Sequence, residues 1–555
     1  MIRAVVVVGL LVACGSPQQP VREHTVGWCK PSEPCWPSAA EWNTLRGQLA
    51  GQLVQSGASV ESANPFALQD DVAATQSRGW IDAWTRAASP YAVVAENAND
   101  IAAAVRFASA HHIRIAIKGT GHDYLGRSTN ADALLIWTHH MRAIDVSDAF
   151  VQHGCSVPAV PAVTVGAGTR WIEAYRAVSV DHGRYVQGGG CTSVGVAGGF
   201  LQGGGFGSWS KEFGVAAGSL LEAEVVTADG AIRIANACSE PDLYWALRGG
   251  GGGTFGVVTR VTLATYPLPA TFGVARGKIT AKTDAAYRRL LDHFLAFYRE
   301  RLDNEHWGES IQVRADNVLR ISMSSQGLSQ AETDEAWQPF RAWLASDPDL
   351  VVELAVQSFP SNAMWNAQVL HQVAPDAIAL DDRAGADPNA YWWAGDAEQV
   401  GAYWYAYVSR WIPQATFADP RLAVALFEGS RHWSIELHFN KGLAGGSPAA
   451  LARSRATALN PDALAASALM ITGAFGAKPA LDRSEGERAR AGVAAAVAPL
   501  EALIPEAGSY ANEGDYFERD WQRRFWGASY ARLLAIKRAY DPTNLFTCHH
   551  CVGSE

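Results

Sequence analysis

The chain has 555 residues, more than one hydrophobic core usually organises, so we expect two or three packed units. With 48% hydrophobic and 18% charged residues, its composition is that of a globular protein and not of a disordered chain. The formal net charge of −10 argues against a nucleic-acid-binding protein, which would carry a basic domain or stripe.

The first residues are typical of an export signal. An apolar stretch over 4–13 suits the hydrophobic region of a signal peptide and is too short to span a bilayer. Leu-Val-Ala-Cys at 11–14 resembles a bacterial lipobox, so we expect residues 1–14 to be a signal peptide and Cys14 to carry a lipid. An ordinary secretory signal is the alternative. No other apolar run is long enough for a transmembrane helix. We therefore expect an exported protein, either lipid-anchored to the outside of the bacterial inner or outer membrane, or periplasmic or secreted.

Eight cysteines suit an oxidising compartment. With one reserved for the lipid and Cys191 set aside for reasons given below, six remain, and the sequence leaves their pairing open. A zinc site in the Cys-His-His-Cys run at 548–551 is disfavoured, because four consecutive residues can hardly surround one tetrahedral ion. Short spacings favour two pairs and leave a third: Cys29 with Cys35, Cys548 with Cys551, and Cys155 with Cys238.

The clearest local pattern lies between residues 90 and 120. Residues 91–94 and 113–117 have the composition of strands, and 101–111 carries an apolar face at helical spacing. Asn99 or Asp100 is expected to cap this helix. The order strand, helix, strand predicts a βαβ unit, and a glycine-rich turn follows at once.

Further along the chain, the residue pattern changes. Short strand-like runs separated by Gly, Asp and Asn turns recur up to Pro267, whereas the following residues alternate strands with Ala-rich helices at 284–300, 330–345 and 484–502. This mixture predicts an α+β protein. We expect a linker and helical lead-in over 15–84, a first domain over 85–267, a second domain over 268–504 with an antiparallel sheet covered by helices on one face, and a closing segment over 505–555.

The first chemical motif is Lys-Gly-Thr-Gly-His-Asp-Tyr at 118–124, directly after a predicted strand. Glycines there let successive N–H groups curl around an anion such as a pyrophosphate. The motif lacks the Gly-Lys-Ser/Thr of a Walker loop, and it does not open a helix as the dinucleotide fingerprint should. By itself it indicates only a turn.

Two further glycine clusters strengthen the case for a large ligand. Residues 188–207 contain ten glycines around Cys191, mixed with apolar residues that a flexible polar linker would lack. In the second cluster, a predicted helix over 242–248 ends in five glycines, at 249–253, and the chain resumes as an apolar strand. Such clusters indicate backbone that closely approaches a flat or phosphorylated ligand.

Together these motifs, in this order, resemble the FAD-binding domain of the p-cresol methylhydroxylase and vanillyl-alcohol oxidase superfamily, within its branch of berberine-bridge-enzyme-like oxidases. The closing segment adds a match: Tyr-Ala-Asn-Glu at 510–513 and Tyr-Asp-Pro-Thr-Asn-Leu-Phe at 540–546 resemble the end of that branch. The residues in and around these motifs are most similar to those of fungal-type secreted members. The resemblance implies a two-lobed FAD-binding α+β domain of the p-cresol methylhydroxylase type, with an inserted substrate domain.

The resemblance also implies FAD attached by two covalent bonds. His122 occupies the position of the histidine bonded to the flavin 8α-methyl carbon, and Cys191 that of the cysteine bonded to flavin C6. A structural His122 and a disulfide-bonded Cys191 are the alternatives. The cofactor-binding residues expected from the matching motifs are Lys118, Gly119, Thr120, Gly121, His122, Asp123, Gly190, Cys191, Thr192, Ser193, Gly195, Gly199, Gly203, Gly204, Val258, Tyr510, Asn512 and Asn544.

The catalytic base is where the chain departs from the family pattern. Alcohol-oxidising and sugar-oxidising relatives often have Tyr-x-Asn-Tyr with the second tyrosine as base, whereas Glu513 stands at that position here. A carboxylate in an apolar site can serve as a base, and an ion-paired structural role is the alternative. Glu436 and His438, on a predicted strand, are the other candidates for the base.

The leading functional hypothesis is an FAD-dependent oxidase that removes a hydride from a hydroxyl-bearing carbon of an alcohol, a sugar or a secondary metabolite. Molecular oxygen would be the acceptor, and the small-molecule substrate and O2 the only partners expected. One alternative is a dehydrogenase that uses another electron acceptor, and another is a non-enzymatic extracellular binding module. No metal is expected.

Overall fold

The computed structural model describes residues 27–476 and 481–554. The predicted signal peptide and Cys14 lie outside these residues. Among the described helices, none combines the length and hydrophobicity that a membrane crossing requires.

The first layer is a four-stranded sheet with the order β1 (Gln52–Gln55), β4 (Tyr91–Val94), β6 (Ala133–Trp137) and β5 (Arg114–Lys118). The last three strands are parallel, and β1 is antiparallel to β4. The predicted strands at 91–94 and 113–117 are confirmed as β4 and β5. They belong to a parallel sheet, although β6 lies between them.

Helix α3 (Ala98–Ala110), which joins β4 to β5, is also confirmed, but its predicted cap was wrong. The cap is Asn97, whose side chain accepts hydrogen bonds from the N–H groups of Asn99 and Asp100. Only Asn97 has the extended backbone that lets a side chain reach back to these free donors. The carboxylate of Asp100 instead accepts from three loop N–H groups, those of Ala50, Gly51 and Glu96.

The second layer is an antiparallel sheet with the order β11 (Ile232–Asn236), β10 (Leu220–Val226), β12 (Val257–Pro267), β8 (Val160–Gly166) and β7 (Ile144–Phe150). The short strand β9 (Arg184–Val186) pairs with the far end of β12. A hydrophobic core joins this sheet to helix α7 (Pro241–Leu247) and to the C-terminal helices α15 (Trp521–Trp526) and α16 (Tyr530–Tyr540).

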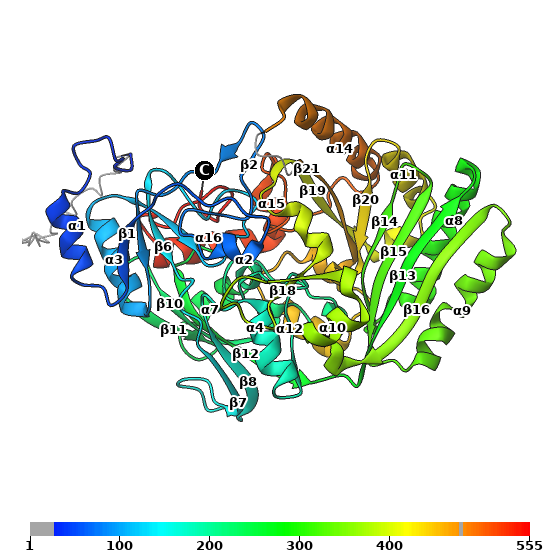
Figure 1. Ribbon diagram of the computed structural model, residues 1–555, viewed down its shortest axis with the longest axis horizontal. Helices are drawn as coiled ribbons and strands as arrows, with labels where there is room; N and C mark the ends of the chain where they lie inside the picture. The colour runs from blue at the N-terminus through cyan, green and yellow to red at the C-terminus, as the bar shows by residue number, and fades with distance from the viewer. Residues whose placement is uncertain (1–26, 477–480, 555) are drawn as a thin grey trace, which may run out of the picture.

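The third layer is a nine-stranded sheet, which forms the other half of the molecule (Figure 1). Helices α8 (Asp284–Phe297), α9 (Gln330–Ser346), α11 (Arg421–Ser430) and α14 (Arg483–Leu503) lie along its outer side. The predicted helices and the predicted α+β class are therefore confirmed. The strand order is β16 (Leu350–Pro360), β13 (Thr271–Ala281), β15 (Val318–Gln326), β14 (Trp307–Val313), β20 (Ile435–His438), β21 (Ala466–Gly476), β19 (Tyr403–Pro413), β2 (Gly79–Trp80) and β3 (Trp84–Thr85).

The N-terminal lead-in is less helical than we expected. It contains α1 (Ala39–Arg46) and α2 (Pro65–Gln69), but it also adds β1 to the first sheet, and β2 and β3 to one end of the third. The latter two strands have two residues each, too few for the sequence to show an alternating pattern. The division of the chain at residues 84, 267 and 505 stays a prediction.

The three expected cysteine pairs, two from short spacing and one left over, are confirmed. Disulfides join Cys29 with Cys35, Cys155 with Cys238, and Cys548 with Cys551. Within the described residues, Cys191 alone is a free thiol.

Candidate flavin site

The turn that carries His122 and the loop that carries Cys191 lie against each other. The backbone N–H of Gly195 donates to Thr120 Oγ1 at 3.0 Å, and His122 Nε2 lies 3.0 Å from Ser193 Oγ. The turn follows β5, and the loop follows β9. Gly121 has the positive φ of 75° that glycine adopts without strain, so it can turn the chain toward the loop.

His122 is held through one ring nitrogen. Its Nε2 lies 3.1 Å from Gln69 Nε2, and the same amide nitrogen donates to the carbonyl of Ser193 at 2.7 Å. Burial lowers the pKa of His122 to about 4, because the charged imidazolium would lose its hydration. The ring is therefore neutral at neutral pH. The Gln69 contact was not anticipated from the sequence, since α2 carries no motif.

Cys191 lies beside a carboxyl group that the sequence did not single out. Burial raises the pKa of its thiol well above the usual range, and the neighbouring Asp396, with which it shares a hydrogen bond, raises it further. Asp396 belongs to the short 3₁₀ helix η6 (Ala394–Gln399), and burial raises its own pKa to about 6. The sulfur is thus a protonated thiol at neutral pH, next to a carboxylate that can accept its proton.

The segment that precedes η6 covers the Cys191 loop. The indole N–H of Trp393 donates to the carbonyl of Gly190 at 2.9 Å, and the hydroxyl of Thr192 donates to the carbonyl of Tyr391. These bonds fix the backbone on both sides of Cys191. They come from β18 (Tyr391–Trp393), a strand 200 residues away in the chain.

The glycine-rich loop is packed on one side and open on the other. A Cβ atom at Gly203 would lie 2.3 Å from the side chain of Asn512, and one at Gly252 would lie 2.7 Å from Gly199 Cα. In contrast, a Cβ at Gly190, Gly198 or Gly199 would meet no heavy atom within 4 Å. Glycine is therefore needed on the packed side because a Cβ atom there would clash with a neighbouring side chain or backbone, and the open side leaves backbone groups accessible to a ligand.

Unpaired polar atoms line the same region. In the described residues, three buried side-chain oxygens near the loop lack a hydrogen-bond partner: Gln69 Oε1, Thr169 Oγ1 and Gln202 Oε1. Buried polar atoms normally have a hydrogen-bond partner. These oxygens therefore indicate that the polar groups of a ligand, or bound waters, donate to them. An open glycine loop, a neutral imidazole and a thiol, together with these oxygens, fit a large cofactor such as FAD.

Three other predicted site residues have clear structural roles. The ammonium of Lys118 is buried and donates to the carbonyls of Asp71, Val72 and Ala74 at 2.6–2.9 Å, so all three of its protons hold the lead-in loop. Burial lowers its pKa to about 7. Asp123 accepts from the backbone and the guanidinium of Arg127. Val258 is buried in β12.

The closing segment reaches the glycine-rich loop through Tyr510 and Asn512. Asn512 Nδ2 donates to the carbonyl of Gly199 at 2.9 Å and to the Tyr510 hydroxyl at 2.9 Å. The hydroxyl of Tyr510 also accepts from the N–H of Gly205 at 3.2 Å. These contacts bring the adjacent residue, Glu513, to the same side of the molecule.

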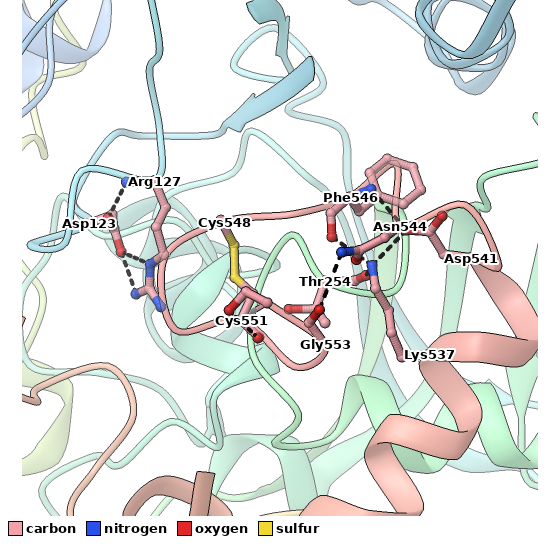
Figure 2. The surroundings of a disulfide bond; sticks show 11 residues. Asp123, Arg127, Thr254, Lys537, Asp541, Asn544, Phe546, Cys548, Cys551 and Gly553 are labelled. Atoms are coloured by element: carbon pink, nitrogen blue, oxygen red, sulfur yellow. Dashed lines mark hydrogen bonds and ion pairs between the residues drawn. A yellow bond between two sulfur atoms is a disulfide. The ribbon is translucent and has the colours of Figure 1, made fainter. Parts of the chain in front are cut away.

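Figure 2 shows how the end of the chain is held. Lys537 Nζ is buried and donates to the carbonyl of Thr254 at 2.8 Å, to Asp541 at 2.6 Å and to the carbonyl of Phe546 at 2.6 Å. Asn544 donates to the carbonyl of Gly553 at 3.2 Å, inside the tail. The C-terminal tail is therefore tied to the chain next to the five-glycine run.

The three candidate bases lie in two hydrogen-bonded groups. Both carboxylate oxygens of Glu513 accept from Lys441 Nζ at 2.6 Å. Glu436 Oε2 lies 3.0 Å from His438 Nε2, and Glu436 Oε1 accepts from Gln312 Nε2 at 3.1 Å. Burial acts to raise the pKa of Glu436, but the bond from His438 and the nearby cations leave it lowered.

Two tyrosines join these groups to the anchors. Burial raises the pKa of Tyr407, and so do the charges of Glu513 and Glu436. Burial likewise raises the pKa of Tyr124, with further contributions from Cys191 and Glu513. The two rings lie 5.6 Å apart. Tyr407 was missed because β19 alternates aromatic residues on both faces, so the sequence does not show which ring faces the site.

Comparison with known proteins identifies this arrangement. Residues 89–236 match a family model described as an FAD binding domain, and residues 509–553 match one described as berberine and berberine like. An uncharacterised FAD-linked oxidoreductase of Arthroderma benhamiae is 31% identical, over 95% of this chain and 94% of the relative. The VAO-type flavoprotein oxidase VAO615 of Thermothelomyces thermophilus is 29% identical, over 95% and 92% of the two chains.

Solved structures agree. The VAO-type flavoprotein MtVAO615 from Myceliophthora thermophila C1 superposes with a TM-score of 0.78 at 25% identity, over 95% of this chain and 97% of that one. A chitooligosaccharide oxidase shares the fold, with a TM-score of 0.68 at 18% identity, over 93% of this chain and 100% of that one. The protein has the α+β fold of p-cresol-methylhydroxylase-type flavoproteins. The chain therefore belongs to the family of FAD-linked oxidoreductases that contains the VAO-type and berberine-bridge-enzyme-like oxidases, and it is an enzyme of that family.

Proposed function

We propose that the protein is an oxidase that holds FAD through bonds to His122 Nδ1 and Cys191 Sγ. The observation that carries this proposal is the meeting of two nucleophiles at one open glycine loop, although 69 residues separate them in the chain. A structural neighbour, the glucooligosaccharide oxidase of Acremonium strictum, is described as carrying a 6-S-cysteinyl, 8α-N1-histidyl FAD. Histidine and cysteine stand at the matching motif positions here.

We propose that the reaction is removal of a hydride from a hydroxyl-bearing carbon of an alcohol, a sugar or a secondary metabolite. When bound, FAD supplies the hydride acceptor, and O2 then takes the electrons as hydrogen peroxide. Chitooligosaccharide and carbohydrate oxidases among the structural neighbours support a substrate with hydroxyl groups.

For the proton, we propose Glu513 as the base. It follows Asn512, which touches the glycine-rich loop, and its charge acts on Tyr407 and Tyr124 beside Cys191. Its ion pair with Lys441 gives it a fixed orientation. Glu436 and His438 remain the alternatives, because they belong to the same electrostatic group.

A dehydrogenase with another electron acceptor is the second candidate function. The third candidate, a non-enzymatic binding module, is wrong, because the family is one of FAD-linked oxidoreductases. Family names that include oxidases favour O2 as the acceptor here.

The test is to reduce the purified enzyme anaerobically with a panel of sugars, alcohols and secondary metabolites, and then to admit O2. An oxidase is reoxidised within seconds and forms one hydrogen peroxide per flavin. Reduced flavin that persists in air but is reoxidised by a quinone or a dye would support the dehydrogenase instead.

We also propose that the protein is exported and held on the outside of a bacterial membrane through lipidated Cys14. Labelling cells with a tagged fatty acid tests this. The wild-type protein should carry the label and sediment with membranes, and a Cys14→Ser variant should lose both properties. An unlabelled wild-type protein in the soluble exported fraction would support an ordinary secretory signal.

A further inference from the structure

We infer that Ser193 selects the tautomer of His122 that leaves Nδ1 free for bond formation, and that Gln69 donates to Nε2 once the bond has formed. This inference rests on the proposed histidyl bond to FAD. It concerns two positioning residues, since both act through the imidazole.

The first observation is that Nε2 and Nδ1 have different surroundings. Ser193 Oγ lies 3.0 Å from Nε2, and Gln69 Nε2 lies 3.1 Å from it. Within the described part of the chain, no hydrogen bond involves Nδ1 of His122, and this atom is not among the buried unpaired ones. The free nitrogen of the ring is therefore the one that can react.

The second observation fixes which way each partner acts. An amide nitrogen can only donate, and the orientation of the Gln69 amide is set by its 2.7 Å bond to the Ser193 carbonyl. The hydroxyl of Ser193 can accept or donate. Nε2 therefore has an acceptor when it carries a proton and a donor when it does not. Both partners are buried, with 3% exposure for Gln69 and 4% for Ser193.

These two states match the two ends of the bond-forming step. Before it, Nδ1 must present its lone pair, so the ring proton sits on Nε2 and is donated to Ser193 Oγ. Afterwards Nε2 has only a lone pair, which accepts from Gln69. The pair therefore serves both the reactant and the product without moving a backbone atom.

The atoms and electrons of the step balance with O2 as oxidant. A bond forms between Nδ1 and the 8α-methyl carbon of FAD, and one C–H bond of that methyl group breaks. The proton on Nε2 leaves as well. The electron pair of the C–H bond passes through the flavin to O2, which takes up both protons and becomes hydrogen peroxide.

The neutral ring favours this role. Because burial lowers the pKa of His122 to about 4, the imidazole does not need to lose an extra proton before it reacts at neutral pH. What remains to be chosen is the tautomer, and hydrogen-bond partners are the means by which proteins choose it.

The experiment uses the full-length Cys191→Ala protein, in which His122 is the sole expected anchor. Apoprotein made in a riboflavin-starved host is mixed with FAD in air, and flavin that survives acid precipitation is followed with time. The affinity for FAD before bond formation is measured in parallel by flavin fluorescence.

We expect Ser193→Ala to slow attachment by about tenfold, the effect of losing one buried hydrogen bond. Gln69→Leu removes a donor that Nε2 needs only after the bond has formed, so it should change the rate by far less. The affinity for FAD should stay within about threefold. Ser193→Thr, which keeps the hydroxyl, should restore the rate. The matched control is Ser430→Ala, which removes another fully buried serine hydroxyl, in α11, and should attach FAD at the parent rate.

Gln69→Glu is the second test and keeps the size of the side chain. The new carboxyl oxygen would lie where the amide nitrogen lay and would accept a hydrogen bond from His122 Nε2. Nε2 should therefore stay protonated after the bond to FAD has formed. The ¹⁵N signal of the flavin-linked imidazole in histidine-labelled protein distinguishes a protonated Nε2 from an unprotonated one.

Attachment in Ser193→Ala within twofold of the parent rate would overturn the inference. So would equal rates in Ser193→Thr and Ser193→Ala, or an unchanged ¹⁵N signal in Gln69→Glu. If the Cys191→Ala parent binds FAD but holds none after acid, then the histidyl bond itself is wrong, which separates that failure from failure of the Gln69 and Ser193 roles.

Discussion

The two proposed anchors show how one physical effect can have opposite chemical consequences. Burial disfavours the charged form of both side chains. For His122 it lowers the pKa to about 4 and leaves the neutral imidazole, which is the nucleophilic form. For Cys191 it raises the pKa and leaves the thiol, whereas the thiolate is the nucleophile.

The surroundings of each anchor match this difference. His122 has a hydrogen-bond acceptor and a donor at Nε2, which orient a ring that is already reactive. Cys191 has Asp396, a carboxyl group with a pKa of about 6 that can take up the thiol proton. We therefore expect the imidazole to need orientation and the thiol to need a base.

The largest effect should come from removing both anchors. His122→Ala with Cys191→Ala should lose all acid-stable flavin, and each single variant should keep it through the remaining bond. Absorbance of acid-washed, unfolded protein measures this. A single variant without any acid-stable flavin would show that only one of the two residues bonds FAD.

The next effect concerns the proposed base, Glu513. Glu513→Gln keeps the shape of the side chain and removes its basicity, which should slow anaerobic flavin reduction by about 10²–10⁴-fold. Glu436→Gln is the matched variant and should change the rate by far less. Stopped-flow absorbance measures both rates. If Glu436→Gln slows flavin reduction strongly and Glu513→Gln does not, the base belongs to the pair of Glu436 and His438.

Removing the carboxylate of Asp396 tests whether the Cys191 thiol needs a base. In a His122→Ala background, Asp396→Asn should slow thioether formation by at least about 10²-fold, the effect of losing a general base. With Asp396 present, the rate should rise with pH through about 6, since the carboxyl must be ionised to accept the proton. The same pH step in the Asn variant would mean that another group takes the proton.

The bond to the His122 imidazole, followed in a Cys191→Ala background, should show no such pH step.

The smallest effect on the anchors should come from the C-terminal tie. Lys537→Met removes a buried ammonium and leaves Asp541 unpaired, which should destabilise the fold by about 3–5 kcal/mol. Denaturant unfolding measures this, and the exposed Lys278→Met is the control. The fraction of acid-stable flavin should not change in folded protein. Its loss would show that the tail acts on the flavin site itself.

The sequence singled out the two proposed anchors but not the residues around them, for a physical reason. His122 and Cys191 stand in glycine clusters, whose cost in chain entropy makes them recognisable without a structure. Gln69, Asp396 and Tyr407 lie on a five-residue helix, a short 3₁₀ helix and an aromatic strand, and only tertiary packing brings them to the anchors.

The sheets follow the same rule. Strands β4 and β5 were predicted because four or five residues of clear pattern surround a helix. Strands β2 and β3 were not, because β2 pairs with β19, which lies more than 300 residues away in the chain, and β3 pairs only with β2. The role of Lys118 was likewise invisible, since the carbonyls that it binds belong to a loop.

The most direct test of FAD attachment at His122 and Cys191 is mass spectrometry of the wild-type enzyme, digested with trypsin and then acidified. Cleavage after Lys118, Arg127, Arg184 and Lys211 should release peptides 119–127 and 185–211. We expect one species in which a single FAD joins these two peptides, with His122 and Cys191 as the modified residues. Recovery of both peptides unmodified, with FAD free in solution, would contradict it.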